Sequence, residues 1–541
     1  MKFGNIQIDP ATNPAVLDTA TWDPDGAWQI IHEVETTHWQ AVMQALRESR
    51  DVPVHECCAV YRGSYTHKEG TACFVARLRD GQHVFIEIAG EDAAGALGRA
   101  AQTKPLDDGI RLAIHAADTA TIRQYVSTIR PDKAPRAMGA VPRLGIGCRM
   151  STSVWPGVWQ AMDECRFAAN AIQNSVRELN LLEDVLAGRA PRSNYLYGFG
   201  TLEEGHTGST FEGLWVAGVI EALKTDTHPA YGADADHITV RQGPGGIERA
   251  KRIIDAVGDY TFFTLDVSDI VDYRVSAQPS ANAHRFADKY GPAMDVVEEL
   301  ASHITGLKGT VPFDLELSID ECPPRMDAAL CLTTEAELRF LIHELRRRSV
   351  PITHIAPNVG IVKGQDYEAP DGLAELENRL GRLHEIAAEH GIMLDIHSGD
   401  DLRAAVRQTI GRATKGHNHF KVSPSLQVIF GETLHELDPE RFRLWWDDTL
   451  AYARREAAAG SDFAVQCLRG YESSERAAPS PHHAVFHHYN FASVGRRDAN
   501  GQFVLREQFY SLPAEFYREY SDRIRRFLCE VAADVFCLEG K

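Results

Sequence analysis

The chain has 541 residues, of which 44% are hydrophobic and 24% are charged, a composition typical of a folded globular protein. At this length we expect a large domain with additions rather than a single sandwich. The formal net charge of −20 argues against a general nucleic-acid-binding protein, because such a protein needs a basic face to replace counterions. A local basic pocket for a small anionic substrate is compatible with an acidic surface.

The sequence contains no apolar stretch of the roughly 18 to 20 residues that cross a bilayer. Its first ten residues have no apolar core of signal-peptide length, which predicts a cytoplasmic protein with no membrane partner. The ten cysteines are scattered, mostly in apolar runs, and form no CxxC pair. They are typical of reduced core thiols, so we expect neither a disulfide nor a zinc-finger framework.

Residues 1–140 have the pattern of a separate N-terminal α/β domain. Two strand-like runs, 72–78 and 83–88, flank a segment whose Asp80-Gly81 pair is typical of a hairpin turn. The proline-containing segment 131–136 has the composition of a linker.

Residues 141–430 alternate between short apolar runs and helical periodicity. The predicted strands are 143–147, 165–173, 233–238, 260–267, 313–319, 352–358, 393–399 and 419–424, and the predicted helices include 247–257, 293–304, 335–348 and 372–390. This alternation favours a parallel sheet with right-handed crossovers, and eight such units predict a (β/α)8 TIM-type barrel. An open doubly wound sheet is the alternative. No GxGxxG or Walker A motif accompanies any strand-to-helix turn, which weakens nucleotide-binding interpretations.

Residues 431–541 are mostly helical in pattern and form a predicted C-terminal extension. Within the barrel region, the charged run 344–348 is interpreted as a solvated helix face, with a phosphate-binding patch as the alternative. The glycine-rich run 243–246 before a helix is a turn, or alternatively an anion site at the helix N-terminus.

Three histidines lie at or just beyond predicted strand ends: His237, His397 and His419. Neutral imidazoles suit Zn, Mn, Ni or Fe, and carboxylates near them in the sequence can orient them, namely Asp236, Asp395 and Asp400. Because barrel active sites gather at the C-terminal ends of the strands, we predict a divalent-metal site at that rim. Taken alone, a histidine is more often a structural or surface group than a ligand, and no HExxH motif is present.

Glu316 lies inside the predicted strand 313–319. Strand alternation places Asp314, Glu316 and Ser318 on one face, which would point into the barrel. A carboxyl group buried there needs a partner or a raised pKa, and both conditions suit a general acid or base. A buried structural salt bridge is the alternative.

Several further polar residues follow predicted strands and could hold a substrate carboxylate or hydroxyl: Arg149, Gln173, Ser175, Arg177 and Lys363. Each alone is equally compatible with a surface or loop position. Asp266 and Asp269 could instead cap the next helix. The histidine-rich run 482–488 could supply further ligands, although its first pair is more compatible with an exposed loop.

The motifs resemble the tagaturonate/fructuronate epimerase family of bacterial hexuronate catabolism. The segments that carry the resemblance are 173–178, 231–237, 262–269, 313–321, 363–367, 394–399 and 419–421, in the order of the family. The most specific is Gly232-Ala233-Asp234-Ala235-Asp236-His237, and weaker similarity extends from the N-terminal hairpin to His488. The resemblance implies a metal-dependent epimerase that interconverts D-tagaturonate and D-fructuronate.

Carried over residue by residue, the resemblance implies Asp236 as proton acceptor and Glu316 as proton donor. It implies His237 and His397 as metal ligands, with His419 as the third. The expected substrate-binding residues are Arg149, Gln173, Arg177, Lys363, Lys421 and His488. The expected cofactor is a divalent metal ion (Zn, Mn, Ni or Co), and the expected partner is a small sugar acid; a homo-oligomer is compatible with this interpretation.

The chain departs from the family in two places beside the expected pocket. Residues 422–426 replace a turn that contains Gly or Thr in the family, and residues 357–360 lack an expected arginine. Retro-aldol cleavage with re-addition and carbonyl migration both remain open, because each needs two opposed proton-handling groups and an electrophile. A metal-dependent sugar aldolase or ketose/aldose isomerase is the alternative enzyme, and a non-catalytic sugar-acid-binding protein is the alternative from another class.

Overall fold

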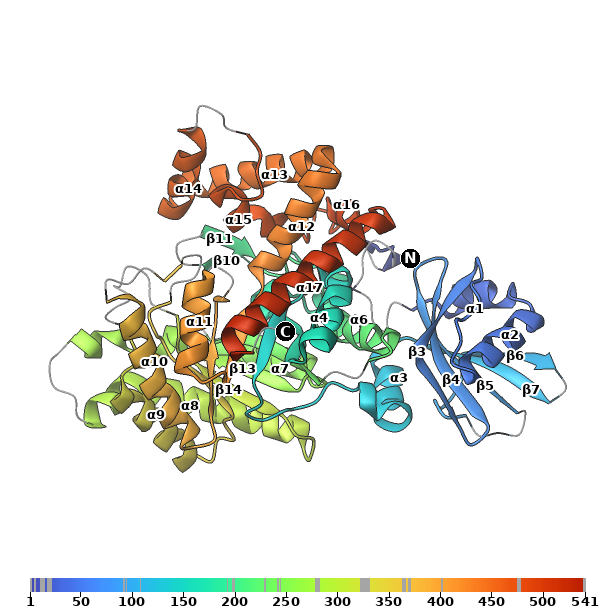
Figure 1. Cartoon of the computed structure of the whole chain (residues 1–541), viewed down its shortest axis with the longest axis horizontal. Coiled ribbons are helices and arrows are strands. Elements are labelled where there is room, and N and C mark those ends of the chain that lie inside the picture. Colours follow the sequence, from blue (N-terminus) through green and yellow to red (C-terminus); the bar gives the residue numbers. More distant parts are fainter. Residues whose placement is uncertain are drawn as a thin grey trace.

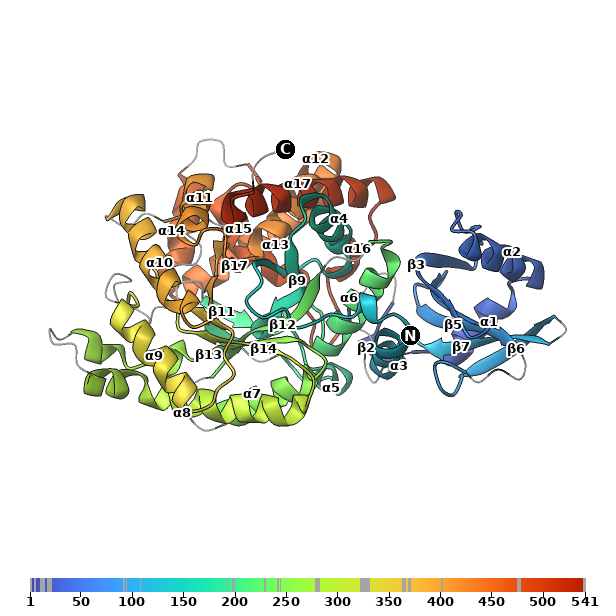
Figure 2. The same ribbon diagram turned by 60° about the horizontal axis from the view of Figure 1, so that its bottom comes forward.

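The computed structural model describes residues 2–3, 6–9, 15–16, 22–90, 93, 95–107, 109–191, 193–196, 200–227, 230–240, 243, 245–277, 283–321, 331–361, 366–367, 371–399, 402–473 and 478–538. Its central unit is a closed barrel of parallel strands in the order β12-β13-β14-β15-β16-β17-β8-β9 (Figures 1 and 2). These strands are β8 (Arg143–Gly147), β9 (Ala168–Ser175), β12 (Tyr231–Thr239), β13 (Phe262–Asp266), β14 (Asp314–Ser318), β15 (His354–Ala356), β16 (Met393–Ile396) and β17 (Asn418–Val422). The predicted (β/α)8 barrel is confirmed, and the open-sheet alternative is wrong.

Each predicted barrel strand is present, with its ends shifted by a few residues. The largest shift is at the second strand, where Cys165 ends helix α4 (Trp155–Cys165) instead of beginning the strand. Arg166 then adopts φ 57°, a left-handed conformation that commonly terminates a helix, and β9 begins at Ala168. Helix and strand thus meet in a tighter connection than the apolar pattern predicts.

Helices surround the barrel, and those predicted from periodicity are all present. The predicted helices correspond to α7 (Gly246–Ala256), α8 (Ala283–Lys308), α9 (Glu335–Arg347) and α10 (Gly372–Ala388). The barrel region also contains α6 (Phe211–Lys224), α11 (Ala404–Ala413), α12 (Pro424–Leu437) and the short α5 (Leu182–Leu186). Helix α8 begins ten residues before its predicted start at 293 because it runs through Pro292. A proline inside a helix removes one backbone hydrogen bond, yet packing here overrides that local signal. A small hairpin of β10 (Ser193–Leu196) and β11 (Gly200–Glu203) follows α5.

An antiparallel sheet and three helices precede the barrel (Figure 1). The sheet has the order β3-β4-β5-β7-β6, with strands β3 (Cys58–Lys68), β4 (Thr71–Leu78), β5 (His83–Gly90), β6 (Gln102–Asp107) and β7 (Ile110–Ala116). The helices are α1 (Pro24–His32), α2 (Thr36–Arg47) and α3 (Thr119–Gln124). The short strands β1 (Lys2–Phe3) and β2 (Ile6–Gln7) come before them in the chain. Strands β4 and β5 pair as the predicted hairpin, and Gly81 has φ 89° in its turn. Phe74 packs with the α1/α2 core, whereas its neighbour Val75 packs with the barrel core, so both faces of the sheet are buried.

The C-terminal region is helical, as predicted, but its last helix returns to the barrel. It contains α13 (Pro439–Ala458), α14 (Asp462–Glu472), α15 (Ala484–Tyr489), α16 (Arg506–Tyr510) and α17 (Ala514–Phe536). A Cβ atom on Gly157 of α4 would lie 2.4 Å from the Ser521 carbonyl oxygen, and one on Gly411 of α11 would lie 2.3 Å from that of Asp534. These close approaches seat α17 between α4 and α11, where it closes the ring of helices (Figure 2). Among the described residues, no helix has the length and apolar character needed to span a membrane.

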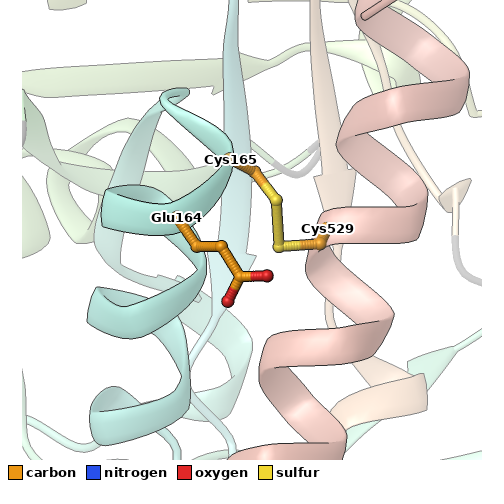
Figure 3. A group of neighbouring side chains, drawn as sticks. All are labelled: Glu164, Cys165 and Cys529. Atoms are coloured by element: carbon orange, nitrogen blue, oxygen red, sulfur yellow. A yellow bond between two sulfur atoms is a disulfide. The ribbon is translucent and has the colours of Figure 1, made fainter. Parts of the chain in front are cut away.

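A disulfide between Cys165 and Cys529 joins α4 to α17 (Figure 3). The prediction that all ten cysteines are reduced core thiols is therefore wrong for this pair. The two Cα atoms lie 5.8 Å apart, within the usual range for a disulfide, although 364 residues separate them in the chain. Scattered spacing carries no signal for such a pair, because only the packing of α17 on α4 brings the two residues together.

Replacing Cys529 with serine is expected to destabilise the chain. A disulfide that closes a long loop stabilises a fold by about 2–4 kcal/mol, mainly by restricting the unfolded chain. Thermal melts of the oxidised protein should therefore show a lower Tm for the variant, and a reducing agent should lower the wild-type Tm towards it. Cys537→Ser is the matched control, since Cys537 is an exposed free cysteine at the C-terminal end of the same helix, α17. Equal melting of the Cys529 and Cys537 variants would contradict the prediction.

Candidate active site

Asp236 and His237 reach the same site because β12 contains a bulge. Between Ala235 and Ile238 the strand has one residue more than its partner β13, so the pairing shifts by one position. Regular alternation would point two successive side chains to opposite faces, whereas the bulge turns both towards the barrel rim. His237 adopts φ 55°, an uncommon conformation for a residue other than glycine. Asp236 Oδ1 and His237 Nδ1 lie 2.8 Å apart.

His237, His397 and Asp320 form a group that could hold a cation. One ligand atom from each residue lies within 4.8 Å of the others. Nε2 of His237 and Nδ1 of His397 are buried and have no hydrogen-bond partner among the described residues. Asp320 Oδ2 lies 3.2 Å from His397 Nδ1, and Glu321 Oε1 lies 3.7 Å from His237 Nε2. Two buried imidazole nitrogens without partners and adjacent carboxylates are the donor set that Zn, Mn, Ni or Co prefers.

The second ring nitrogen of each histidine contacts a carboxyl group predicted to move protons. His237 Nδ1 contacts Asp236, and His397 Nε2 lies 2.8 Å from Glu316 Oε1. Such contacts fix the orientation of an imidazole and direct its other nitrogen at a metal. The residues predicted as metal ligands and as acid and base thus form one connected cluster.

Lys421 contacts both of the predicted proton-handling groups, Asp236 and Glu316. Its buried ammonium donates hydrogen bonds to Asp236 Oδ1 at 2.8 Å, to Thr264 Oγ1 at 3.0 Å and to Glu316 Oε2 at 3.1 Å. Asp395 and Asp234 lie at 3.3 and 3.5 Å. Burial favours the neutral amine, but these carboxylates together raise the pKa of Lys421 well above its usual value. Lys421 is therefore a fixed cation within the cluster.

Asp236 and Glu316 have opposite shifts in pKa. Burial raises the pKa of both groups. For Asp236, the charges of His237 and Lys421 outweigh burial and hold its pKa well below the usual value. For Glu316, the charge of Asp395 adds to burial and raises its pKa well above the usual value. An ionised carboxylate opposite a protonated carboxyl group is the arrangement that acid–base catalysis needs.

His419 lies in a different group from the other two histidines. It is fully buried with Glu316 and Asp395, and its Nδ1 lies 2.7 Å from Asp395 Oδ2. Burial lowers the pKa of His419 to about 4, against the opposing effect of Asp395, so the ring is neutral at neutral pH. The structure therefore brings His237 and His397 together and places His419 beside the acid.

The two arginines predicted to bind substrate are engaged in ion pairs at the rim. Arg149 contacts Glu178 at 2.7 Å, and Arg177 contacts Glu321 at 3.1 Å. Gln173 is buried in β9, and its Oε1 has no hydrogen-bond partner among the described residues. Gln173 lies within β9, which pairs with β12, whereas Arg149 and Arg177 follow β8 and β9.

Two further predicted residues have different positions. Lys363, like Asp400, lies outside the described residues. His488 lies in α15, where its ring centroid is 4.9 Å from that of Phe463 and 4.7 Å from that of His487. It belongs to the C-terminal helices that follow the barrel.

Sequence reasoning did not single out Asp320, Thr264 or Glu178 as site residues. Asp320 follows β14, and its polar position after an apolar strand was a usable signal. Thr264 lies within β13, and nothing in the sequence distinguishes a threonine of an active site from one buried in a strand. Glu178 follows the predicted Arg177, and only the fold shows that it pairs with Arg149 and lies near Asp236.

The fold and the cluster together define a barrel enzyme with a buried acid–base pair beside two histidines. Residues 277–443 match the family model of tagaturonate epimerase. This segment contains Glu316, His397, His419 and Lys421. The match confirms the resemblance inferred from the sequence, and with it the prediction of a carbohydrate epimerase.

Crystal structures of fructuronate-tagaturonate epimerase UxaE from Cohnella laeviribosi are similar to the chain. The native structure is 18% identical with a TM-score of 0.63, and a structure with two glycerols is 18% identical with a TM-score of 0.65. Each alignment covers 93% of this chain and 100% of the other. At this identity the likeness shows a shared fold along nearly the whole chain. No curated protein sequence matches the chain.

Proposed function

We propose that the chain is a metal-dependent epimerase that interconverts D-tagaturonate and D-fructuronate at the rim of the barrel. The observation that carries the proposal is the connected cluster in which Asp236 and Glu316, with opposite pKa shifts, each contact one of two histidines. The match to the tagaturonate epimerase family supports the choice of substrate.

His237 and His397 would hold the cation through the two ring nitrogens that lack partners, with Asp320 as the third protein ligand. This assignment places Asp320 where the resemblance implies His419. The candidate cations are Zn, Mn, Ni and Co, and elemental analysis of the purified protein distinguishes them. When bound, the cation supplies a Lewis acid that stabilises negative charge on the carbonyl and neighbouring hydroxyl oxygens of the substrate.

The protein residues would handle the protons of the reacting carbon. Asp236 is ionised and accepts the proton of the hydroxyl group at that carbon. In the retro-aldol route the bond between that carbon and its neighbour then breaks and re-forms on the opposite face. Protonated Glu316 donates its proton to the resulting alkoxide oxygen, which becomes the hydroxyl of the opposite configuration. Lys421 contacts both carboxyl groups and fixes the distance between them. We assign Arg149, Arg177, Gln173, Lys363 and His488 to substrate binding around this centre.

The direct test is incubation of purified, metal-loaded protein with D-tagaturonate, followed by NMR. The appearance of D-fructuronate supports the proposal. Three-carbon fragments would indicate an aldolase, and an aldose product would indicate an isomerase. Binding of the sugar acid without turnover would indicate a binding protein.

Metal binding is expected to release a proton and to strengthen as pH rises. Burial lowers the pKa of His397, but the charge of Asp320, with a further contribution from Asp395, raises it well above its usual value. The metal-free ring is thus protonated at neutral pH, and a cation must displace that proton from its ligand nitrogen. Calorimetric titrations in buffers of different ionisation enthalpy measure this release directly. An affinity independent of pH below neutrality would contradict the prediction.

A further inference from the structure

We propose that Glu178 is a substrate-binding residue that accepts a hydrogen bond from a hydroxyl group of the sugar acid. This inference rests on the proposed function, because it assigns a role in recognition at the same site. Glu178 ends segment 173–178, which carries part of the family resemblance but implies no role for this residue.

Glu178 lies at the same rim as the acid–base cluster. It ends the short helical turn Val176–Glu178, which follows β9 directly. Strand β9 pairs with β12, and Ser175 lies opposite Asp236 in that pairing. The charged and titratable groups that act on Glu178 are Arg149, His206 and Asp236. Glu178 therefore follows the strand next to that of the base, close enough for the charges of Glu178 and Asp236 to interact.

One oxygen of the Glu178 carboxylate has no hydrogen-bond partner within the part of the chain that the structure describes. Oε1 accepts hydrogen bonds from Nε and Nη2 of Arg149, at 3.0 and 2.7 Å. Oε2 is buried and accepts no hydrogen bond from the described residues, although only 8% of the side chain is exposed. A buried carboxylate oxygen without a donor is costly, so such an atom is expected to receive a donor from a bound molecule.

Glu178 is held rigidly from two directions. The Thr207 hydroxyl donates a hydrogen bond to the Glu178 carbonyl oxygen, and Arg506 donates to the Thr207 carbonyl. The His206 ring lies next to the Glu178 carboxylate and packs edge-on against Phe491, with centroids 4.9 Å apart. The C-terminal region thus supports the wall of the site, and the free oxygen is preorganised as an acceptor.

The chemistry of the acceptor selects the group it binds. Arg149 keeps the pKa of Glu178 below its usual value against the effect of burial, so the carboxylate is ionised and can only accept. The ionised carboxylate of a sugar acid has no proton to donate, whereas its hydroxyl groups do. In the proposed reaction Asp236 faces the hydroxyl at C4, the carbon that is inverted. We therefore assign the hydroxyl on the neighbouring C5 to Glu178, whose charge interacts with that of Asp236.

The test compares the binding of D-tagaturonate and its 5-deoxy analogue to the metal-loaded, full-length protein by calorimetry. The wild-type protein should bind D-tagaturonate about 30-fold more tightly than the analogue, since a buried acceptor left unpaired is penalised. In Glu178→Gln the two ligands should bind within about threefold of each other. Arg149 holds the single amide oxygen, and the NH2 group that replaces Oε2 cannot accept a hydrogen bond. The wild-type comparison stands even where the variant does not fold.

Glu337→Gln is the matched control. Glu337 is a buried carboxylate paired with Lys289 between α8 and α9, so its loss should lower Tm but leave the preference for D-tagaturonate unchanged. A wild-type protein that binds both ligands equally, or a Glu178 variant that weakens both equally, overturns the inference. Failure of the proposed function is separate: it would appear as absent turnover, while the binding comparison still decides the role of Glu178.

Discussion

Replacing Glu316 with glutamine is expected to lower kcat by about a thousandfold, which is the typical contribution of a positioned general acid. The side chain is fully buried, and burial with the charge of Asp395 keeps it protonated at neutral pH. Glutamine has nearly the same shape, and its oxygen can still accept the hydrogen bond from Lys421, but it has no proton to release. The fold and the metal content should therefore stay unchanged while turnover, followed by NMR, is lost.

The pH profile of the wild-type enzyme provides a second measurement of the same assignment. Activity should fall as pH rises through the raised pKa of Glu316, because the proton donor is lost. It should fall at low pH only when Asp236, whose pKa is held well below its usual value, becomes protonated. A profile whose alkaline limb begins near the ordinary pKa of a glutamate would contradict the assignment.

Asp234→Asn is the matched control for Glu316→Gln. Asp234 is also buried and lies 3.5 Å from the Lys421 ammonium. Burial raises its pKa to about 7, although Lys421 opposes this shift, so a neutral amide is a close substitute for a group that is already partly protonated. We expect an effect on kcat of less than about tenfold. Equal losses from the two variants would show that the loss comes from disturbing a contact of Lys421 and that Glu316 has no special role.

The barrel could be predicted because its signals are local. Each strand is a short apolar run that ends in polar residues, and each intervening helix has its own periodicity. The place of α17 between α4 and α11 could not be predicted in this way. It depends on contacts such as those of Gly157 and Gly411 with the α17 backbone, and no local pattern records them. The Cys165–Cys529 disulfide was missed for the same reason.

The sequence was sufficient to predict which residues form the site, but not which side chains contact one another there. The resemblance identified Asp236, His237, Glu316 and His397, and the structure brings these four together. It could not show that a bulge in β12 turns Asp236 and His237 to one side. Nor could strand-end positions distinguish a free arginine from one that is already paired with a glutamate at the rim. Such pairings depend on the geometry between neighbouring strands.

Replacing His237 with alanine is expected to weaken divalent-metal binding by about a hundredfold or more and to abolish turnover. The prediction follows from the Nε2 atom of His237, which is buried without a hydrogen-bond partner among the described residues and faces His397 across 4.6 Å between ring centroids. Removing it leaves only one imidazole and a carboxylate, which hold such ions weakly. Elemental analysis after dialysis, with titration of the metal-free protein, measures the loss.

Asp320→Asn and His419→Gln together decide the third ligand. Asp320 lies within 4.8 Å of both proposed imidazole ligands, so its variant should bind metal about tenfold to a hundredfold more weakly. His419 is neutral, fully buried and grouped with Glu316 and Asp395, so glutamine in its place should leave the metal content unchanged even where it reduces stability. If the His419 variant lost metal and the Asp320 variant retained it, the cation would lie deeper in the barrel, between the acid and Asp395. Glu316 would then be a ligand rather than a proton donor, and its pKa would be lowered instead of raised.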